Sequence, residues 1–158
     1  MEVQMWTFEK IKEKLNSRHI PFEEVAFSDT AVSARMTDTS VNGNYDPRNA
    51  VKTLLVKGKA GVFALILRGE DKVDTDKLKE LIGKWSVVTA PELETNFGLV
   101  AGGINPFVLD VPILLDESVL QLTTLSMGAG SVTQGINIKT DDLIKHLVFK
   151  TVKIRKEA

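Results

Sequence analysis

Apolar residues recur at roughly helical spacing near the start of the chain, among many charged residues. The recurring positions are Trp6, Phe8, Ile11 and Leu15. An apolar stripe of this period is typical of an amphipathic helix with one face on a core. Pro21 lacks a backbone N–H and ends the expected helix.

A second pattern predicts a β-hairpin of two buried strands. The run VKTLLVK at 51–57 is separated by the turn GKAG from the run VFALILR at 62–68. Strand-like runs between turn residues predict five further strands, at 22–27, 111–116, 122–128, 135–139 and 150–155. Residues 30–41 fit either a helix or a long loop.

Capping residues predict three further helices. The expected caps and the segments that they begin are Asp74 or Thr75 for 76–82, Thr89 with Glu92 for 89–98, and Thr140 for 141–147. Gly83 and Gly98 stand where a helix C-terminus favours glycine. Strands outnumber helices, and hairpins mix with helical insertions, so the sequence predicts an α+β fold rather than a doubly wound sheet.

Length and composition narrow the class of protein. We expect residues 1–158 to form one domain, because this length is enough for a sizeable core. The net charge of −1 provides no basic field for a long duplex, so no DNA partner is expected and any nucleic-acid contact must be local. The absence of cysteine excludes disulfides, thiolate metal sites and a thiol nucleophile, and no metal or other cofactor is expected.

The distribution of apolar residues argues against a membrane protein. The longest apolar run, Val62–Leu67, is far too short to span a bilayer. The first residues mix charged and apolar side chains and contain no signal-peptide core. We therefore expect a cytoplasmic protein with no membrane partner.

The loop LVAGGINPF at 99–107 is the first candidate for a ligand site. Gly102 and Gly103 allow positive φ and the close approach of another molecule. Pro106 fixes φ and stiffens the far end of the loop. Such a stiff turn with a bare backbone is either a tight corner or a cradle for a ligand.

A charged residue interrupts the first strand of the predicted hairpin. Lys52 stands between Val51 and Thr53 in an otherwise apolar run. It is either a lysine that snorkels or faces a sheet edge, or a cation at the mouth of a pocket that meets a phosphate or carboxylate.

Other polar positions point to no catalytic group. His19 and His146 lie near expected helix ends and are interpreted as surface or capping residues. The residues DES at 116–118 follow a strand and are interpreted as a turn rather than an acid pair. The glycines of GAGSVTQG at 128–135 match neither the dinucleotide nor the Walker pattern, and indicate a strand connection or a second pocket wall. The sequence shows no classical triad, metal site or nucleophile elbow.

Six motifs follow one another in an order found in a known family. They are AVKTLLVK, KVDTDKLKELIG, APELETNFGLVAGGINPF, VPILLDES, GAGS and INIKTDDLIK, which cover about residues 48–147. On these motifs the chain resembles the YbaK/prolyl-tRNA editing family, the free-standing relatives of the editing domain inserted in bacterial prolyl-tRNA synthetases. The resemblance implies a mixed, barrel-like β-sheet surrounded by helices.

The resemblance also implies an activity, the hydrolysis of the ester that joins a wrong amino acid to tRNA, usually the proline tRNA. Lys52 matches the lysine that these domains need for deacylation, and residues 102–106 match the loop that grips the 3′-terminal adenosine and its aminoacyl group. Residues 129–137 fall in the segment that lines the amino-acid side of the pocket. The implied catalytic residues are Lys52, Gly102 and Gly103, and the implied substrate-binding residues are Ile104, Asn105, Pro106, Gly128, Ala129, Gly130 and Asn137.

Some positions depart from the pattern of the family. Many bacterial members have serine where Asn105 stands, and an aspartate often appears near the position of Asn137. No histidine occupies the pocket position that the synthetase-inserted domains use. These departures leave the deacylase assignment in place, but the identity of the amino acid does not follow from the resemblance.

We therefore predict a trans-editing aminoacyl-tRNA deacylase that binds the 3′ end of aminoacyl-tRNA, with prolyl-tRNA synthetase as an additional candidate partner. The small residues GAGS at 128–131 predict removal of a small amino acid, alanine first and then cysteine or serine. Two alternatives stay open. One is a non-catalytic module that holds aminoacyl-tRNA or a synthetase, and the other is a hydrolase of free esters or amides, against which the missing protein nucleophile counts.

Overall fold

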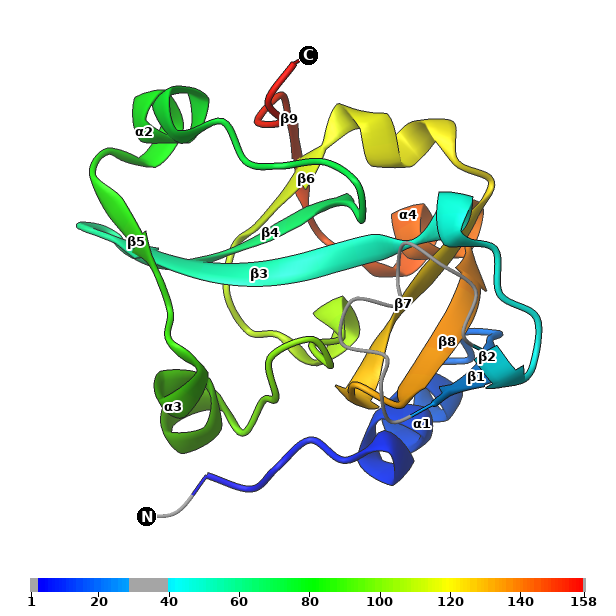
Figure 1. The fold of residues 1–158 in the computed structure, drawn as a ribbon. Helices are drawn as coiled ribbons and strands as arrows, with labels where there is room; N and C mark the ends of the chain where they lie inside the picture. The colour runs from blue at the N-terminus through cyan, green and yellow to red at the C-terminus, as the bar shows by residue number, and fades with distance from the viewer. Residues whose placement is uncertain (1–2, 29–39, 158) are drawn as a thin grey trace.

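Two β-sheets and the helices around them make up the described part of the protein. The computed structural model describes residues 3–28 and 40–157. One sheet has four strands in the order β2-β1-β8-β7, and the other has five in the order β5-β3-β4-β6-β9 (Figure 1). The predicted α+β class is confirmed. Both sheets are open over the described residues, so the barrel-like closure is not confirmed.

The four-stranded sheet is antiparallel throughout. Its strands are β1 (Glu23–Phe27), β2 (Ser40–Asn42), β7 (Thr124–Ser131) and β8 (Gln134–Lys139). β1 lies between β2 and β8, and β8 pairs with β7. The expectation of a helix or a long loop at 30–41 is wrong for residues 40–41, which begin β2; residues 30–39 lie outside the described residues.

The five-stranded sheet combines antiparallel and parallel pairing. Its strands are β3 (Val51–Gly58), β4 (Gly61–Arg68), β5 (Trp85–Val87), β6 (Ile113–Asp116) and β9 (Lys150–Val152). β3 and β4 form the predicted hairpin, and β4, β6 and β9 run parallel. The last strand ends at Val152 and not at residue 155, because Arg155 pairs instead with Val73 in an isolated bridge.

One helix precedes the first strand, and the others lie in connections between strands. They are α1 (Phe8–Ser17), α2 (Thr75–Ile82), α3 (Ala90–Glu92) and α4 (Thr140–His146). α3 continues as a π-helical turn over Leu93–Phe97. Three-residue and five-residue 3-10 helices lie at Pro47–Asn49, Pro106–Val108 and Glu117–Gln121.

Side-chain caps explain where most of these helices begin. The Thr7 hydroxyl accepts from the N–H of the third residue of α1, which satisfies one of the unpaired donors of the first turn. Asp74, rather than Thr75, caps α2. Thr89 and Glu92 form the predicted capping box, in which each side chain accepts from the backbone N–H of the other.

The prediction that Thr140 caps the last helix is wrong. Thr140 is the first helical residue, and the N-cap position belongs to Lys139, whose side chain makes no capping hydrogen bond. The Thr140 hydroxyl donates to the carbonyl oxygen of Leu122 at 2.5 Å. The Thr140 hydroxyl, which the local pattern predicts at the helix N-terminus, therefore binds the carbonyl of a residue distant in sequence.

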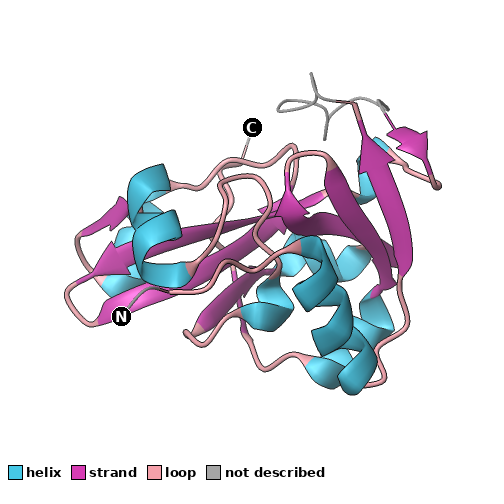
Figure 2. Ribbon diagram, turned by 90° about the horizontal axis from the view of Figure 1, so that it is seen from below, coloured by secondary structure: helices cyan, strands magenta, loops and turns pink. Residues whose placement is uncertain are grey.

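Alternating residues of β7 and β8 separate the main core from an opposite face of the sheet. The core side carries Leu125, Met127, Ala129, Ile136 and Ile138, which pack with Ile11 and Leu15 of α1 and Leu143 of α4. Figure 2 shows helices gathered on one side of these strands. Because successive side chains of a strand point to opposite sides, Ser126, Gly128 and Asn137 belong to the other face.

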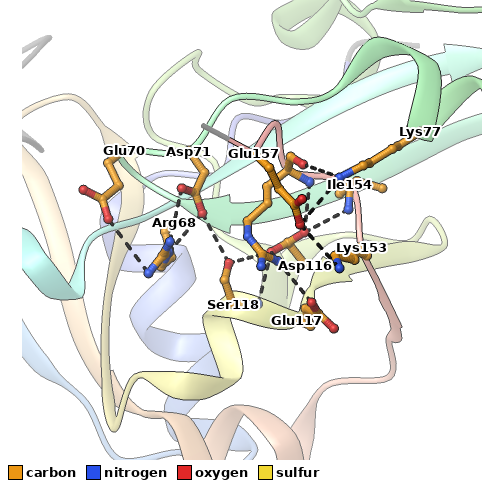
Figure 3. A network of polar contacts seen from close by, with 11 residues as sticks. Arg68, Glu70, Asp71, Lys77, Asp116, Glu117, Ser118, Lys153, Ile154 and Glu157 are labelled. Carbon is orange, nitrogen blue, oxygen red and sulfur yellow. Dashed lines mark hydrogen bonds and ion pairs between the residues drawn. The ribbon is translucent and has the colours of Figure 1, made fainter.

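A buried carboxylate joins the ends of the parallel strands. Asp116, at the end of β6, is 0% exposed and accepts from the backbone N–H groups of Ile154 at 2.9 Å, Arg155 at 3.1 Å and Ser118 at 3.1 Å (Figure 3). The Ser118 hydroxyl donates to it at 2.5 Å and the Arg155 guanidinium at 3.1 Å. Burial raises the pKa of Asp116, but these hydrogen bonds to the charged form outweigh it and hold the pKa below its ordinary value.

We predict that Asp116→Ala lowers the free energy of unfolding by about 3 kcal/mol, because several buried donors lose their acceptor. Urea unfolding monitored by circular dichroism measures the loss. Asp46→Ala is the matched control, because Asp46 also caps a 3-10 helix and pairs with an arginine, Arg48, but on the surface. A loss in Asp116→Ala no larger than that in the control would contradict the central role of this carboxylate.

Candidate functional site

The loop at 99–107, here called the glycine loop, packs with its bare backbone directly on β7. The Gly103 carbonyl accepts from the Gly130 N–H at 2.8 Å. A Cβ atom on Gly103 would lie 2.6 Å from the Ser131 nitrogen, and one on Gly128 would lie 2.9 Å from the Gly103 carbonyl carbon. Gly102 has φ +82°, a conformation that side-chain-bearing residues avoid. The loop can take this place only because these positions are glycine.

Asn105 fastens the same loop from its other end. Its side chain is 0% exposed, donates from Nδ2 to the Gly128 carbonyl at 2.9 Å and accepts at Oδ1 from the Phe107 N–H at 3.0 Å. The second bond caps the 3-10 helix that starts at Pro106. The Asn105 side chain thus orients the loop backbone in this structure and presents no surface to a ligand.

Asn137 lies on the face of the sheet opposite the main core. Its Oδ1 accepts from the hydroxyl of Ser126, its partner across the β7–β8 ladder, and its Nδ2 donates to the Asn44 carbonyl. These residues line a polar hollow of about 380 Å³. The remaining lining residues are Glu23, Gly43, Tyr45, Asp46, Asn49 and Thr124.

Lys52 is half-buried, and its amine is bound by backbone oxygens. The Nζ atom donates to the carbonyl of Asp71 and, at 3.5 Å, to that of Gly69. Lys52 pairs across the hairpin with Leu67, a residue of the second core between β3, β4 and α2. Burial lowers the pKa of the Lys52 amine; the Asp71 charge opposes this and the Lys72 charge adds to it.

Strand pairing brings several of the predicted site residues into one region. Ala50 forms a bridge with Ser126, and Lys52 is two residues further along the same face of the chain as Ala50. Gly128, two residues beyond Ser126, touches the loop at Gly103. The face of β7 that carries Ser126 and Gly128 therefore has Asn137 and Lys52 on its two flanks and the glycine loop at its far end.

Other predicted site residues point elsewhere in this structure. Ala129 and Ile104 are buried in the main core, and a Cβ atom on Gly130 would meet the start of α1, 2.8 Å from the Phe8 nitrogen. Pro106 lines an apolar groove of about 780 Å³ whose lining includes neither Lys52 nor Asn137. The small residues at 128–131 thus serve close packing of backbone, and the substrate-binding role of these positions stays a prediction.

Sequence reasoning missed Ser126 and the polar residues 44–49. Ser126 has a recognisable signal, because the alternation in TLSMGAGS places it on the same face as Gly128. Asn44 and Asn49 carry no such signal, since they enter the hollow through loop conformation alone.

Metal-ligand clusters and the two histidines are the remaining groups that could carry chemistry. Among the described residues, no group of three or more His, Cys, Asp or Glu side chains could hold a metal ion. His19 is exposed and follows α1 with φ +58°, and His146 is the last residue of α4. Within the described ranges, no helix is long and apolar enough to cross a membrane.

A family model for the aminoacyl-tRNA editing domain matches residues 32–146, which is most of the chain. The protein therefore belongs to the aminoacyl-tRNA editing domain family. The resemblance drawn from the motifs at about residues 48–147 is confirmed at this level.

Solved structures share the fold at low sequence identity. A candidate trans-editing enzyme for prolyl-tRNA synthetase superposes with a TM-score of 0.78 at 18% identity, over 95% of this chain and 97% of its own. A hypothetical protein superposes with a TM-score of 0.76 at 20% identity, over 92% of this chain and 99% of its own. A candidate signal transduction protein from Marinobacter aquaeolei gives 0.70 at 14% identity, over 93% of this chain but 30% of its own.

We predict that Gly103→Ala destabilises the protein by about 3 kcal/mol, because the new methyl group would push the loop off the β7 backbone. Gly61→Ala is the control. A Cβ atom added at Gly61 would meet no atom within 4 Å, so the only cost is the φ angle of +124°, which alanine disfavours. We expect a cost of about 1 kcal/mol there. Thermal and urea unfolding of both variants measure the difference, and equal losses would mean that the contact with β7 is not tight.

Proposed function

We propose that the protein is a trans-editing aminoacyl-tRNA deacylase in which residues 1–158 act as one unit. The observation that carries the proposal is the arrangement around β7 in a chain of the editing-domain family. There, the bare backbone of Gly102 and Gly103 adjoins a polar face flanked by Asn137 and Lys52. The substrate is the 3′ end of a mischarged tRNA, which a protein of nearly neutral net charge can grip locally.

The chemistry needs positioning more than a nucleophile. An aminoacyl ester is already reactive, so holding the ester, a water molecule and the ribose hydroxyl together lowers the barrier. The Gly103 N–H donates to the Val100 carbonyl at 2.9 Å and fixes the turn. The Ile104 N–H makes no hydrogen bond with the described residues, and we assign it to the oxygen that becomes negative during hydrolysis.

Lys52 supplies the positive charge of the site. Its amine is held by the carbonyls of Gly69 and Asp71, both acceptors that favour a protonated donor. A lysine here neutralises the phosphate next to the terminal adenosine or fixes the geometry of the surrounding loops. Either role makes Lys52 essential for turnover without making it a nucleophile.

An editing enzyme acts as a second selection step, which removes amino acids that the synthetase attaches by mistake. A synthetase pocket shaped for proline cannot strongly exclude smaller residues, because a missing methylene costs only about 1–3 kcal/mol of discrimination. We propose that the protein removes alanine, cysteine or serine from proline tRNA and spares prolyl-tRNA. Asn137 is the side chain that we assign to the ammonium group of the substrate, since its Oδ1 keeps a second lone pair beside the Ser126 bond.

Prolyl-tRNA synthetase is an additional candidate partner. A trans-editing enzyme meets its substrate soon after the synthetase releases it, so a contact between the two proteins would shorten that transfer. One structural relative is a candidate trans-editing enzyme for prolyl-tRNA synthetase, which supports this proposal.

One observation favours a second candidate function, a module that holds aminoacyl-tRNA or a synthetase without hydrolysis. The Lys52 amine and the Asn105 amide are both engaged in hydrogen bonds within the protein. Groups with internal partners of this kind can serve to shape a binding surface. Hydrolysis assays separate the two functions.

We predict that the protein hydrolyses proline tRNA charged with alanine faster than the cysteine- or serine-charged forms, and leaves prolyl-tRNA intact. Release of radiolabelled amino acid from the four charged tRNAs measures this order, and alanine ethyl ester is the control for general esterase activity. Preferential cleavage of prolyl-tRNA would contradict editing. No cleavage of any charged tRNA would favour the binding module.

We predict that Lys52→Ala lowers the deacylation rate about 100-fold while the fold persists, because the site loses its fixed positive charge. Lys57→Ala is the matched control on the same strand, since Lys57 is exposed and pairs with Glu92. Circular dichroism checks that both variants fold. If Lys52→Ala retains the parent rate, Lys52 is only a strand residue and the site lies elsewhere.

A further inference from the structure

The position of the Lys52 amine is set by a loop and not by the strand that carries Lys52. A lysine amine stands at the end of a flexible four-carbon stem, so its acceptors decide where it rests. Both acceptors, the carbonyls of Gly69 and Asp71, belong to residues 69–74, the connection from β4 to α2. Anything that holds this connection in place also holds the amine.

The segment after β9 holds that connection through its backbone. The Asp74 N–H donates to the Ile154 carbonyl at 2.8 Å, and the Lys156 N–H donates to the Lys72 carbonyl at 2.7 Å. Val73 and Arg155 form an antiparallel bridge between these two bonds. We call residues 153–156 the clamp segment.

The clamp segment is in turn anchored to Asp116. The buried carboxylate accepts from the backbone N–H groups of Ile154 and Arg155 and from the Arg155 guanidinium, which also pairs with Glu117 at 3.3 Å. The segment therefore has two sides: its N–H groups at 154 and 155 bind Asp116, and its other backbone groups bind residues 72–74.

A second connection runs through side chains. The Asp71 carboxylate accepts from the Arg68 Nε at 3.0 Å (Figure 3). The single proton of the Ser118 hydroxyl is shared unequally between two carboxylates, Asp116 at 2.5 Å and Asp71 at 3.3 Å. Asp71 is thus held by its side chain at the residue whose carbonyl binds Lys52. Contacts from Asp116 thus reach residues 72–74 through the backbone of the clamp segment and reach Asp71 through the Ser118 hydroxyl.

We propose that the clamp segment and Ser118 are positioning elements for the reaction: they hold residues 69–74 so that the Lys52 amine stays at the site. The inference rests on the proposed function only in that it makes Lys52 the charged group of the deacylase. It adds a region that touches neither the glycine loop nor the polar hollow. Ser118 and the clamp segment act through Lys52 and contact no substrate.

The test uses two variants that displace the connection without touching Lys52. Lys156→Pro removes the N–H that bonds Lys72 and puts a ring carbon against that carbonyl. Ser118→Ala removes the hydroxyl between Asp116 and Asp71. Glu157→Pro is the control for an added proline, because the N–H one residue later makes no hydrogen bond with the described residues. It also removes the surface ion pairs of Glu157 with Lys77 and Lys153, so Glu157→Ala, which removes only these, is measured beside it.

Two readouts are measured for each variant. The first is kcat and KM for the mischarged tRNA that the parent cleaves fastest. The second is the pKa of the Lys52 amine, from the Nζ resonance of protein labelled with ¹⁵N-lysine and assigned by its loss in Lys52→Arg. The charged groups that act on this amine are Asp71 and Lys72, both in the displaced connection.

We expect kcat to fall about tenfold in both clamp variants with KM changed less than about twofold, as for a misplaced catalytic group. The Lys52 pKa should rise toward its ordinary value in both, because the amine regains water. Glu157→Pro should match the parent in both readouts. These results together would support the clamp. Circular dichroism checks that each variant is folded, so that a shift of the Lys52 pKa reports the displaced connection and not a loss of structure.

Unchanged kcat and unchanged Lys52 pKa in both clamp variants would overturn the inference, and so would an equal fall of kcat in Glu157→Pro. If the parent hydrolyses no charged tRNA, the proposed function fails, and the Lys52 pKa then decides the clamp by itself. A shift in Lys156→Pro and Ser118→Ala supports positioning, and its absence refutes it.

Discussion

The ionised carboxylate of Asp116, which has no contact with water, is the constraint on which the rest of the five-stranded sheet depends. A buried charge is tolerated only with a full set of hydrogen-bond donors around it. Those donors come from the turn after β6 and from the segment after β9, so both must adopt conformations that aim N–H groups at one point. The positions of these segments relative to one another, and to the connection before α2, are consequently fixed. Carbonyls of that connection bind the Lys52 amine.

The candidate site depends on a second constraint, the contact of two backbones without side chains between them. Gly103 and Gly128 lie so close that a Cβ atom on either would overlap the other segment. Asn105 then holds the loop with both ends of its amide. A loop fixed in this way presents backbone N–H groups in set directions, and donors that need no rearrangement are the ones that stabilise a developing charge most.

Much of the fold could be predicted because its signals involve residues close in sequence. The β3–β4 hairpin, the Thr89–Glu92 capping box and the start of α2 each depend on contacts across a few positions. The errors have the opposite origin. Thr140 gives its hydroxyl to Leu122, and residues 153–155 leave the sheet to bind Asp116 and the connection before α2, partners far away in the chain.

The sequence by itself determined the class of fold and the family, and it singled out two groups of the proposed site, Lys52 and the glycine loop. It could do so because motifs and short-range patterns involve residues close to one another in the chain. The tertiary structure alone decided which neighbours these groups have. In the folded protein, the Ala129 side chain is buried in the main core and Gly130 packs against α1. The Asn105 amide donates to the Gly128 carbonyl and so fixes the loop. The tertiary structure also made the turn at 116–118 the centre of a polar network. Such outcomes depend on which distant segments pack together, and buried polar groups and backbone contacts are satisfied only once that packing exists.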